Sequence, residues 1–424
     1  MVEVIVERCA GLDVHKDTVM ACVRRPGAGV RREQEVREFR TFSSSLRDLR
    51  DWLASEGVTQ VAMEATGVYW RPVWDVLEPL AGVELLLCNA HHVKNLPGRK
   101  TDVADSAWLA QLLECGLMRG SFVPPPAIGR LRDLTRYRKK LVEERTREVQ
   151  RVQKLLETAG IKLDSVVSDV MGKSSREMLD ALVAGVRDVE VMAGMARTRM
   201  KAKVPLLRLA LEGGFTEHHA LMLRLHLAHI DQLTEAVGGL DREVEREIAP
   251  FAEPVRRLCT IPGVGQRTAE VVIAEIGVDM SRFPTAGHLA SWAGMCPGNS
   301  ESAGKRRTGK ARKGNQALRS ALCEAAWCAS RAKDTYLQAQ YRRFCRRFGT
   351  RNEAKAIFAV AHSMLVIIWH LLAAEPEEGT GEIIAYTDLG ADWFDKRNDA
   401  AARTRKLVHQ LEQLGHSVTL SAAA

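Results

Sequence analysis

The sequence predicts a mixed fold, an α/β domain followed by a mainly α-helical remainder, and three observations support it. Short apolar runs alternate with helical patterns over the first part of the 424-residue chain. Pro124, Pro125 and Pro126 then interrupt the chain, since consecutive prolines continue neither a helix nor a central strand. Beyond them, long charged stretches carry a narrow apolar stripe, which is typical of amphipathic helices.

The α/β part is expected to follow the order strand, strand, strand, helix, strand, helix, strand, helix. The turn His15-Lys16-Asp17 separates the first two strands, and Ser43 to Ser45 offer an N-cap to the first helix, which Gly57 ends. The strands are expected over residues 4–14, 19–24, 36–42, 58–63 and 83–88, and the helices over about 46–57, 71–80 and 104–115.

Four acidic residues have informative places in this order. Asp13 lies on the first strand, Glu64 ends the fourth, and Asp102 and Asp105 stand at the start of the last helix. Asp102 and Asp105 are three residues apart, so a helix places them on one face. Mg²⁺ prefers a few carboxylates together with water and substrate phosphate. Each acid alone could be a cap, a turn residue or a solvated charge, but the set of four points to a divalent-metal site.

Composition argues against a membrane protein and against wholesale disorder. Hydrophobic residues make up 46% and charged residues 27%, which is ordinary for a soluble protein. The most apolar run, residues 354–374, contains Lys355, His362 and His370 and is expected to be a buried helix. The N-terminus is too short and too acidic for a signal peptide, so we expect a location in the bacterial cytoplasm or nucleoid. The nine cysteines form no C-x-x-C pair. Five of them lie in apolar or small-residue settings and are expected to be reduced core residues, namely Cys9, Cys22, Cys88, Cys259 and Cys296.

Basic residues gather in two clusters that lack acids. The net charge of +8 and a pI near 9.0 favour a polyanionic partner. Clusters of this kind indicate contact with a phosphate backbone, although a charge run is often only a solvated surface. The first cluster contains Lys305, Arg306, Arg307, Lys310, Arg312, Lys313 and Arg319. The second contains Arg342, Arg343, Arg346, Arg347 and Arg351.

Between these regions the chain predicts a helical arm. Residues 128–160, 179–200 and 218–248 share charged, amphipathic spacing, so three long helices in a hairpin or coiled coil are expected. A spacer or dimerisation role is the simplest one for such an arm. His218, His219, His226 and His229 fall inside it, but their spacing matches no known ligand pattern.

Two further features point to phosphate chemistry. The turn Pro262-Gly263-Val264-Gly265 between two helical patterns resembles a helix-hairpin-helix element, in which Gly263 and Gly265 allow close approach of a phosphate; a plain helix start is the alternative. Ser302 lies next to Lys305, Arg306 and Arg307, where cations could hold a phosphodiester against a serine nucleophile. A structural serine is the alternative reading, and Ser300 is a second candidate.

The order of the α/β elements and the places of the four acids resemble the RNase H-like fold of the RuvC type. Over nearly everything from Gly11 to about Leu372, the chain resembles the DEDD insertion-sequence transposases that pair a RuvC-like domain with a C-terminal transposase domain. This is the family of bridge-RNA-guided serine recombinases related to Piv-type DNA invertases. The motifs that carry the likeness are, in order, GLDVHKD, MEATGVYW, NAHHVKNLPGRKTDVADSAWLA, TIPGVGQRTAEVVIAEIG, LASWAGMCPGNSESAGKRRTGKARKGN and LRSAL.

The resemblance implies a complete recombinase. Asp13, Glu64, Asp102 and Asp105 would bind Mg²⁺, and Ser302 would form a covalent phosphoserine link to DNA. Ala303-Gly304 follows Ser302 where the family often has Gly-Gly, which keeps Ser300 open as an alternative. The implied partners are donor and target DNA, a bridge RNA and further copies in a homodimer or homotetramer.

The implied domains are a RuvC-like domain over residues 1–125, a helical arm over 126–250, a C-terminal transposase domain over 251–374 and a tail over 375–424. The competing functions are a RuvC-like structure-selective nuclease that uses water, a Piv-type invertase, and a non-catalytic nucleic-acid-binding scaffold.

Overall fold

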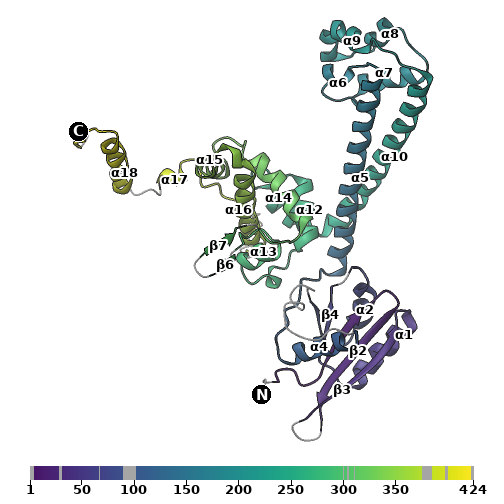
Figure 1. The fold of residues 1–424 in the computed structure, drawn as a ribbon, viewed down its shortest axis with the longest axis vertical. Helices are drawn as coiled ribbons and strands as arrows, with labels where there is room; N and C mark the ends of the chain where they lie inside the picture. The colour runs from purple at the N-terminus through teal and green to yellow at the C-terminus, as the bar shows by residue number, and fades with distance from the viewer. Residues whose placement is uncertain are drawn as a thin grey trace. The chain divides into compact units, whose positions relative to one another are not determined.

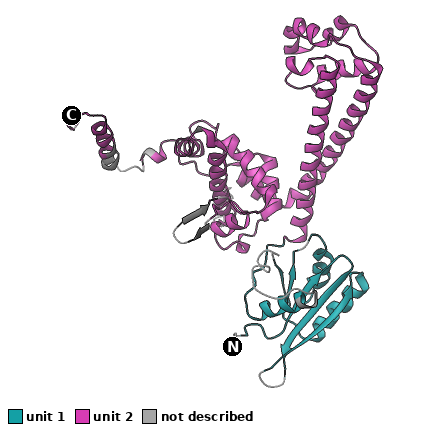
Figure 2. Ribbon diagram, in the orientation of Figure 1, with its two compact units in different colours: residues 1–123 teal, residues 124–424 magenta. Residues whose placement is uncertain are grey.

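The computed structural model describes residues 4–27, 31–65, 67–88, 102–298, 300–302, 305–309, 311–374, 384–396 and 400–421. For some of these, among them 102–104, 300–302 and 305–308, it describes the backbone alone. Lys310 lies outside the described residues. The chain divides into two compact units, residues 1–123 and 124–424, which are described separately below (Figure 2).

A five-stranded sheet with the order β3-β2-β1-β4-β5 forms the centre of the first unit (Figure 1). β1, β2 and β3 are antiparallel neighbours, whereas β4 and β5 run parallel to β1. The strands are β1 Cys9–Val14, β2 Thr18–Pro26, β3 Arg32–Arg40, β4 Gln60–Glu64 and β5 Glu84–Cys88. The element order expected from the sequence is therefore confirmed.

Helices cover both faces of this sheet. α1 (Ser43–Ser55) and α2 (Trp70–Leu77) pack on one face, over a core that includes Leu12, Leu49 and Met63. α4 (Asp102–Glu114) packs on the other face, where Leu113 contacts the cysteines of β1 and β5. Alternate residues of β1 therefore face different helices, as the two-residue repeat of a strand requires.

The first strand begins later than expected. Residues 4–8 lie outside the sheet, because the backbone N–H groups of Ile5 and Val6 donate to the carbonyl of Glu114 at 2.9 and 3.1 Å. The apolar run Val4-Ile5-Val6 thus follows the end of α4, and 65% of Ile5 stays exposed. The composition of this run predicted a strand, but its backbone N–H groups instead donate hydrogen bonds to the carbonyl of Glu114 at the end of α4.

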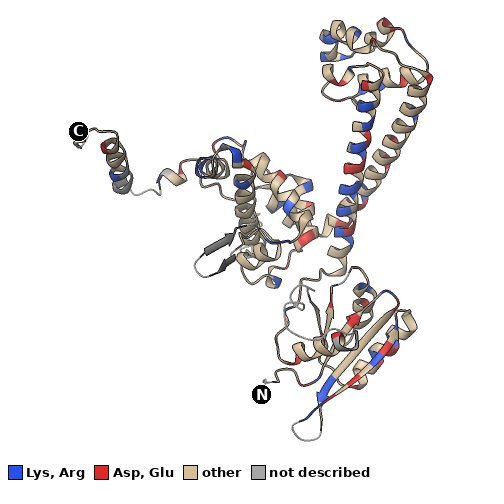
Figure 3. Cartoon of the chain, viewed as in Figure 1, with Lys and Arg blue, Asp and Glu red and all other residues tan. Residues whose placement is uncertain are grey.

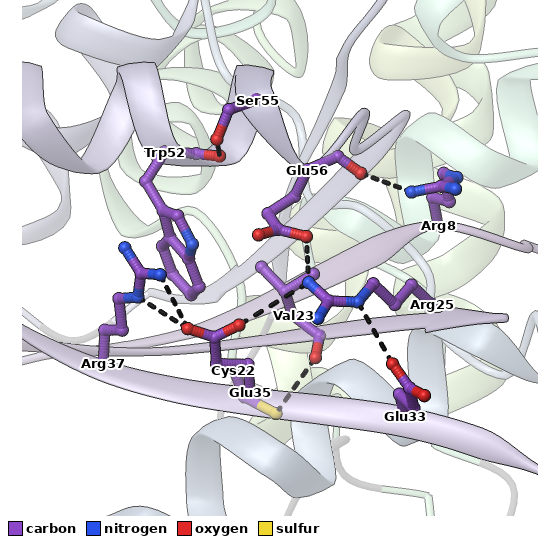
Figure 4. Close-up of polar contacts among 10 residues, drawn as sticks. All are labelled: Arg8, Cys22, Val23, Arg25, Glu33, Glu35, Arg37, Trp52, Ser55 and Glu56. Atoms are coloured by element: carbon purple, nitrogen blue, oxygen red, sulfur yellow. Dashed lines mark hydrogen bonds and ion pairs between the residues drawn. The ribbon is translucent and has the colours of Figure 1, made fainter. Parts of the chain in front are cut away.

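The edge strand β3 has no buried residue, and its charged side chains form ion pairs with neighbouring elements (Figure 4). Arg25 on β2 pairs with Glu56, which follows α1, and with Glu33 and Glu35 on β3. Arg37 donates from Nε to Oε1 of Glu35 at 2.8 Å and lies over the ring of Trp52. Such exposed pairs add little stability, but a charged edge discourages pairing with a further strand.

Two long helices form an arm in the second unit. α5 (Pro126–Thr158) and α10 (Glu217–Ile248) lie side by side, and the ribbon of α5 carries both basic (blue) and acidic (red) positions along its length (Figures 1 and 3). Ion pairs join them, including Arg130 with Glu247 at 3.1 Å and Arg138 with Asp241 at 2.5 Å. The long helices expected over 128–160 and 218–248 are confirmed.

The prediction of a third long helix over residues 179–200 is wrong. Short helices cap the end of the arm instead, because Gly185 adopts a φ of 92° after α7 and Asp188 caps α8 by accepting from Glu190 N–H at 2.9 Å. Thr198 at a φ of 47° breaks the segment again. The cap consists of α6 Leu163–Val166, α7 Lys173–Val183, α8 Val189–Gly194, the 3₁₀ helix η1 Thr198–Lys203 and α9 Val204–Leu211.

The remainder of the second unit is a helical body with one β-hairpin. Its helices are α11 Ala252–Cys259, α12 Gln266–Ile276, α13 Ala286–Trp292, α14 Gln316–Ala329, α15 Tyr336–Phe348 and α16 Glu353–Ala373. The hairpin consists of β6 Ser300–Ser302 and β7 Lys305–Thr308. Short 3₁₀ turns are η2 Ala249–Phe251, η3 Met280–Arg282 and η4 Thr350–Asn352.

α16 is the central helix of this body. By length and composition alone it could span a membrane, a test that the core helix of a soluble protein also passes. It packs against α11, α13, α14 and α15, and Trp369 donates from Nε1 to the carbonyl of Phe283 at 2.8 Å. This agrees with the buried helix expected there from the sequence.

The final segment contains α17 (Trp393–Lys396) and α18 (Ala400–Gln413). Its described beginning packs on the body, since Tyr386 N–H donates to Oγ1 of Thr260 at 2.8 Å and Asp388 accepts from Tyr336 N–H at 2.9 Å. The rings of Tyr336 and Phe394 stack at 5.1 Å.

Candidate functional site

Asp13 and Glu64 lie at corresponding places on neighbouring strands. β1 and β4 are parallel, and Leu12 on β1 pairs with Met63 on β4, so the two acids follow directly after paired residues. Their side chains point to the same face of the sheet, because paired residues in parallel strands share their orientation. Asp13 is 14% exposed and Glu64 is half-buried, so both carboxylates are accessible at the strand ends.

Gly11 brings α4 onto this same face. A Cβ atom at Gly11 would lie 2.3 Å from the carbonyl oxygen of Ser106 and 2.4 Å from the backbone nitrogen of Ala110. Only a glycine permits so close an approach of helix and strand. Ser106 directly follows Asp105, which is half-buried, so the first turn of α4 lies over the strand that carries Asp13. Asp102 begins α4, but its side chain lies outside the described residues.

The polar groups described on this face of the sheet are mainly carboxylate oxygens. His15 Nε2 lies 3.1 Å from Oδ2 of Asp13, which orients that carboxylate. Among the described side chains, no three of the His, Cys, Asp and Glu type are already grouped closely enough to hold a metal ion. The donor set of Asp13, Glu64 and Asp105 is nonetheless chemically suited to a hard cation such as Mg²⁺, which keeps several of its waters.

The cysteines near the acids are inert. Cys9 on β1 and Cys88 on β5 are buried, and burial raises the pKa of each thiol to about 12. A protonated thiol is a poor nucleophile and a poor metal ligand. All nine cysteines are free, and Cys9, Cys22 and Cys88 are buried as expected, whereas Cys259 and Cys296 are only half-buried.

Ser302 lies at the end of β6, in the hairpin of the helical body. The strands pair antiparallel with Ser302 opposite Lys305 and Glu301 opposite Arg306, and the register shifts between Ser300 and Glu301. The side chains of Ser300, Ser302, Lys305, Arg306 and Arg307 lie outside the described residues. The backbone alone places the serine directly across from the first lysine of the basic cluster.

Two glycines hold the ends of the loop that carries this hairpin. Gly294 adopts a φ of 68°, and a Cβ there would lie 2.9 Å from Gly314 Cα. A Cβ at Gly314 would lie 2.3 Å from the carbonyl oxygen of Ala293. The backbone segments before and after the loop therefore touch without side chains between them. Arg312 and Lys313 are both exposed just before this contact.

A buried carboxylate that the sequence analysis missed links this loop to the arm. Glu275 on α12 is fully buried and accepts from Nε and Nη2 of Arg136 on α5 at 2.7 and 2.8 Å. Asn315 donates from Nδ2 to Oε2 of Glu275 at 2.6 Å, and its Oδ1 accepts from Leu318 N–H at 3.0 Å. Hydrogen bonding to Glu275 raises the pKa of Arg136. Asn315 follows Gly314, so one network fixes arm, α12 and the loop end.

The turn between α11 and α12 uses its glycines differently. Gly263 has a φ of 87°, and a Cβ there would lie 2.3 Å from the carbonyl oxygen of Ala325 on α14. Its need for glycine is thus explained by packing within the body. Gly265 is the N-cap of α12, and no atom lies within 4 Å of where its Cβ would be. Of the two, Gly265 leaves open space beside a helix N-terminus.

Comparison with protein families finds two matching regions in the chain. Residues 10–161 match a DEDD transposase family of the IS110 type, and residues 255–342 match the transposase IS116/IS110/IS902 family. The chain carries transposase domains of the IS110/IS116/IS902 family. It is a DNA transposase, and the first match contains all four acids while the second contains Ser302 and the Gly263-Gly265 turn.

Individual relatives of this transposase agree. It is 24% identical over 376 residues to the transposase for insertion sequence element IS1111A of Coxiella burnetii, covering 86% of this chain and 89% of that one. It is 26% identical to an uncharacterised protein of insertion element IS116 of Streptomyces clavuligerus, over 68% and 78% of the two chains. A protein of insertion element IS110 of Streptomyces coelicolor is 33% identical over 32% and 34% of the two chains.

Proposed function

We propose that this transposase cuts and rejoins DNA through a covalent phosphoserine at Ser302, with the four acids holding a divalent metal ion. The observation that carries the proposal is the meeting of Asp13 and Glu64 at the ends of parallel strands, on the face over which Gly11 admits the first turn of α4. That turn carries Asp105 and begins at Asp102.

The acids would serve as a platform for the scissile phosphate. Asp13, Glu64, Asp102 and Asp105 would hold Mg²⁺, which supplies charge neutralisation at the phosphate and lowers the pKa of an oxygen bound to it. His15, at 3.1 Å from Asp13, would keep that carboxylate oriented. A platform of oxygen ligands suits a metal that retains room for substrate oxygens.

The serine would perform the exchange. The Oγ of Ser302 attacks phosphorus, the serine loses its proton, the P–O bond to the departing strand breaks, and the departing oxygen takes up a proton. One phosphodiester replaces another, so the energy of the bond is conserved and rejoining needs no ATP. Lys305, opposite Ser302 in the hairpin, and Arg306 and Arg307 would hold the phosphate and stabilise its developing charge. Lys310, Arg312, Lys313 and Gly265 would bind the flanking backbone.

Partners follow from this chemistry. A bridge RNA would select donor and target DNA, and a homodimer or homotetramer would bring two cutting centres to two DNA ends. The arm would offer a surface for such an assembly, since α5 and α10 lie side by side as two long helices. The bacterial cytoplasm or nucleoid is the place where such substrates occur.

The test is a trapping experiment on suicide DNA substrates whose cut end cannot be religated. We expect a covalent protein–DNA adduct that requires Mg²⁺, is lost in Ser302→Ala and is retained in Ser300→Ala, the matched control on the same strand. Normal cutting and rejoining by Ser302→Ala would refute the serine mechanism and favour a nuclease that uses water. Cutting that persists in Asp13→Asn would refute the role of the acids.

A further inference from the structure

α15 presents a row of arginines on its outer face. Arg342, Arg343, Arg346 and Arg347 recur at spacings of one and four residues, and all four are exposed; they are called the α15 arginine face below. The first turn of the helix is buried, with Leu337, Gln338 and Gln340 packed inside the body. The side opposite the arginines, which carries Phe344 and Phe348, is half-buried. α15 contains no acidic residue and is blue and tan in Figure 3.

These arginines have no acidic partners within the described part of the chain. None of the four forms an ion pair there, whereas Arg130, Arg138 and Arg176 on the arm each pair with a carboxylate of a facing helix. The arginines of the arm and those of α15 therefore have different roles. Those of the arm join helix to helix, and those of α15 keep their charge for something outside the body.

Helix stability does not explain the cluster. Cations in the last turn of a helix gain about 0.3–1 kcal/mol from its dipole, which accounts for Arg346 and Arg347 in that turn. Arg342 and Arg343 lie a turn earlier, and each faces a like charge four residues on, a pairing that costs about 0.2–0.5 kcal/mol. The charges of Arg342 and Arg343 therefore destabilise the helix slightly rather than stabilise it.

Aromatic side chains brace the helix from beside and behind. The rings of Phe344 and Phe348 stack at 5.6 Å and 6°. Arg347 lies over Phe348 and Arg343 over Phe394, at 5.9 and 4.9 Å from the ring centres. These contacts orient two guanidinium groups without neutralising them. The arginine face is therefore partly organised before any partner binds.

We infer that the α15 arginine face binds the phosphate backbone of duplex DNA, at a site separate from the serine hairpin. The inference rests on the proposed function, since a transposase must hold DNA beyond the bond that it cuts. The face extends past residue 342, where the family match ends. A convex helical face suits B-form DNA, whose major groove admits a helix, better than the deep and narrow major groove of duplex RNA.

Salt dependence of binding distinguishes this site from general attraction by a basic protein. Each arginine that neutralises a phosphate contributes about 0.9 to the slope of log Kd against log salt concentration. The double variant R342Q/R346Q removes two charges that have no ring contact among the described residues. Its matched control is R199Q/R224Q, which removes two exposed arginines of the arm that also lack an ion pair there.

The experiment measures binding of the full-length protein to a fluorescent 30-base-pair DNA duplex of mixed sequence between 50 and 300 mM salt. We expect R342Q/R346Q to lower the slope by about 1.8 and to weaken binding roughly thirtyfold at 150 mM salt. We expect R199Q/R224Q to match the unmodified protein, and all three proteins to show the same thermal unfolding.

An unchanged slope in R342Q/R346Q, or an equal change in R199Q/R224Q, would overturn the inference. Equal binding to a duplex RNA of the same sequence, with equal loss in R342Q/R346Q, would overturn the choice of DNA. Failure of the proposed function would appear elsewhere, as absence of the Mg²⁺-dependent Ser302 adduct in the unmodified protein. The two ideas can therefore fail separately.

Discussion

The amide of Asn315 ties the end of the serine loop to a buried carboxylate: Nδ2 donates to Oε2 of Glu275 at 2.6 Å. Glu275 in turn accepts two hydrogen bonds from Arg136 on the arm. Removing a hydrogen-bond partner from a fully buried carboxylate destabilises the fold, because the charge remains desolvated and loses a hydrogen bond that offset that cost. The loop that carries Ser302 is thus fixed by the same network that joins α12 to the arm.

This relationship predicts that Asn315 positions the serine. Asn315→Ser keeps an N-cap oxygen for Leu318 N–H but lacks the reach to Glu275, so we expect the rate of adduct formation at Ser302 to fall about 10- to 100-fold. DNA affinity should stay unchanged, which separates positioning from binding. Single-turnover adduct formation and fluorescence anisotropy measure the two quantities.

The control for Asn315 is Thr335→Ala, which removes the N-cap of α15 in the same body. It should cost about 1 kcal/mol of stability and leave the adduct rate unchanged. Equal rates in Asn315→Ser and the unmodified protein would show that the network supports the fold alone.

The contact between Gly294 and Gly314 predicts a second effect on the same loop. Gly314→Ala places a Cβ about where the carbonyl of Ala293 lies, at 2.3 Å, so we expect a loss of about 1–3 kcal/mol in unfolding free energy together with loss of the adduct. Gly309→Ala is the matched control, because the added Cβ would have no neighbouring atom within 4 Å. It should keep the unfolding free energy and the adduct yield of the unmodified protein. Denaturant unfolding measures the stabilities, and a tolerated Gly314→Ala would contradict the close contact.

Gly11 allows a corresponding test of the acidic face. Gly11→Ala must push α4 away from β1, because its Cβ would meet backbone atoms at 2.3 and 2.4 Å. We expect Mg²⁺-dependent cutting to fall about 100-fold, since displacement of Asp105 by about 1 Å disturbs the platform. Gly120→Ala, in the same unit and with its nearest atom at 3.7 Å, should retain full activity.

The arm contains a pH-sensitive carboxylate. Glu148 is buried on α5, and His226 on α10 contacts it at 2.6 Å. Burial alone would raise the pKa of Glu148, but hydrogen bonds from His226 and Arg151 outweigh it and hold the pKa below its ordinary value of 4.5. A depressed pKa means that the stabilisation is complete above pH 4.5 and is lost as the pH falls through the lowered value.

Glu148→Gln should therefore destabilise the arm at pH 7 by about 1–3 kcal/mol and flatten the loss of stability below pH 5. Glu144→Gln, at an exposed position of the same helix, should change neither. The temperature of the helical unfolding transition between pH 3 and pH 7 measures both effects. A Glu148→Gln protein with the acid sensitivity of the unmodified chain would refute this role.

Local patterns in the sequence were enough to predict the order of strands and helices, both long helices of the arm and the burial of α16. They failed at Val4-Ile5-Val6, where the composition suits a strand but the backbone donors pair with the end of α4. They also failed over 179–200, where an amphipathic pattern conceals the break at Thr198. A contact distant in the sequence decided the first case, and local backbone conformation at Gly185 and Thr198 decided the second.

The candidate site divides in the same way. Asp13, Glu64 and Asp105 stood out because each lies near the end of a strand or in the first turn of a helix that the sequence predicts. Glu275 did not, since an acid near the end of a helix such as α12 resembles a solvated position. Its partner Arg136 lies 139 residues earlier in the chain, so only the folded structure shows that the charge is paired.

The central claim is that the acids and Ser302 act in one reaction, and mass spectrometry of the trapped protein–DNA adduct tests it most directly. After nuclease and protease digestion, we predict a nucleotide on Ser302 in the unmodified protein with Mg²⁺, and no modified peptide in Asp13→Asn or without the metal. A nucleotide on Ser300 or another residue, or DNA that is cut without any modified peptide, would contradict the account.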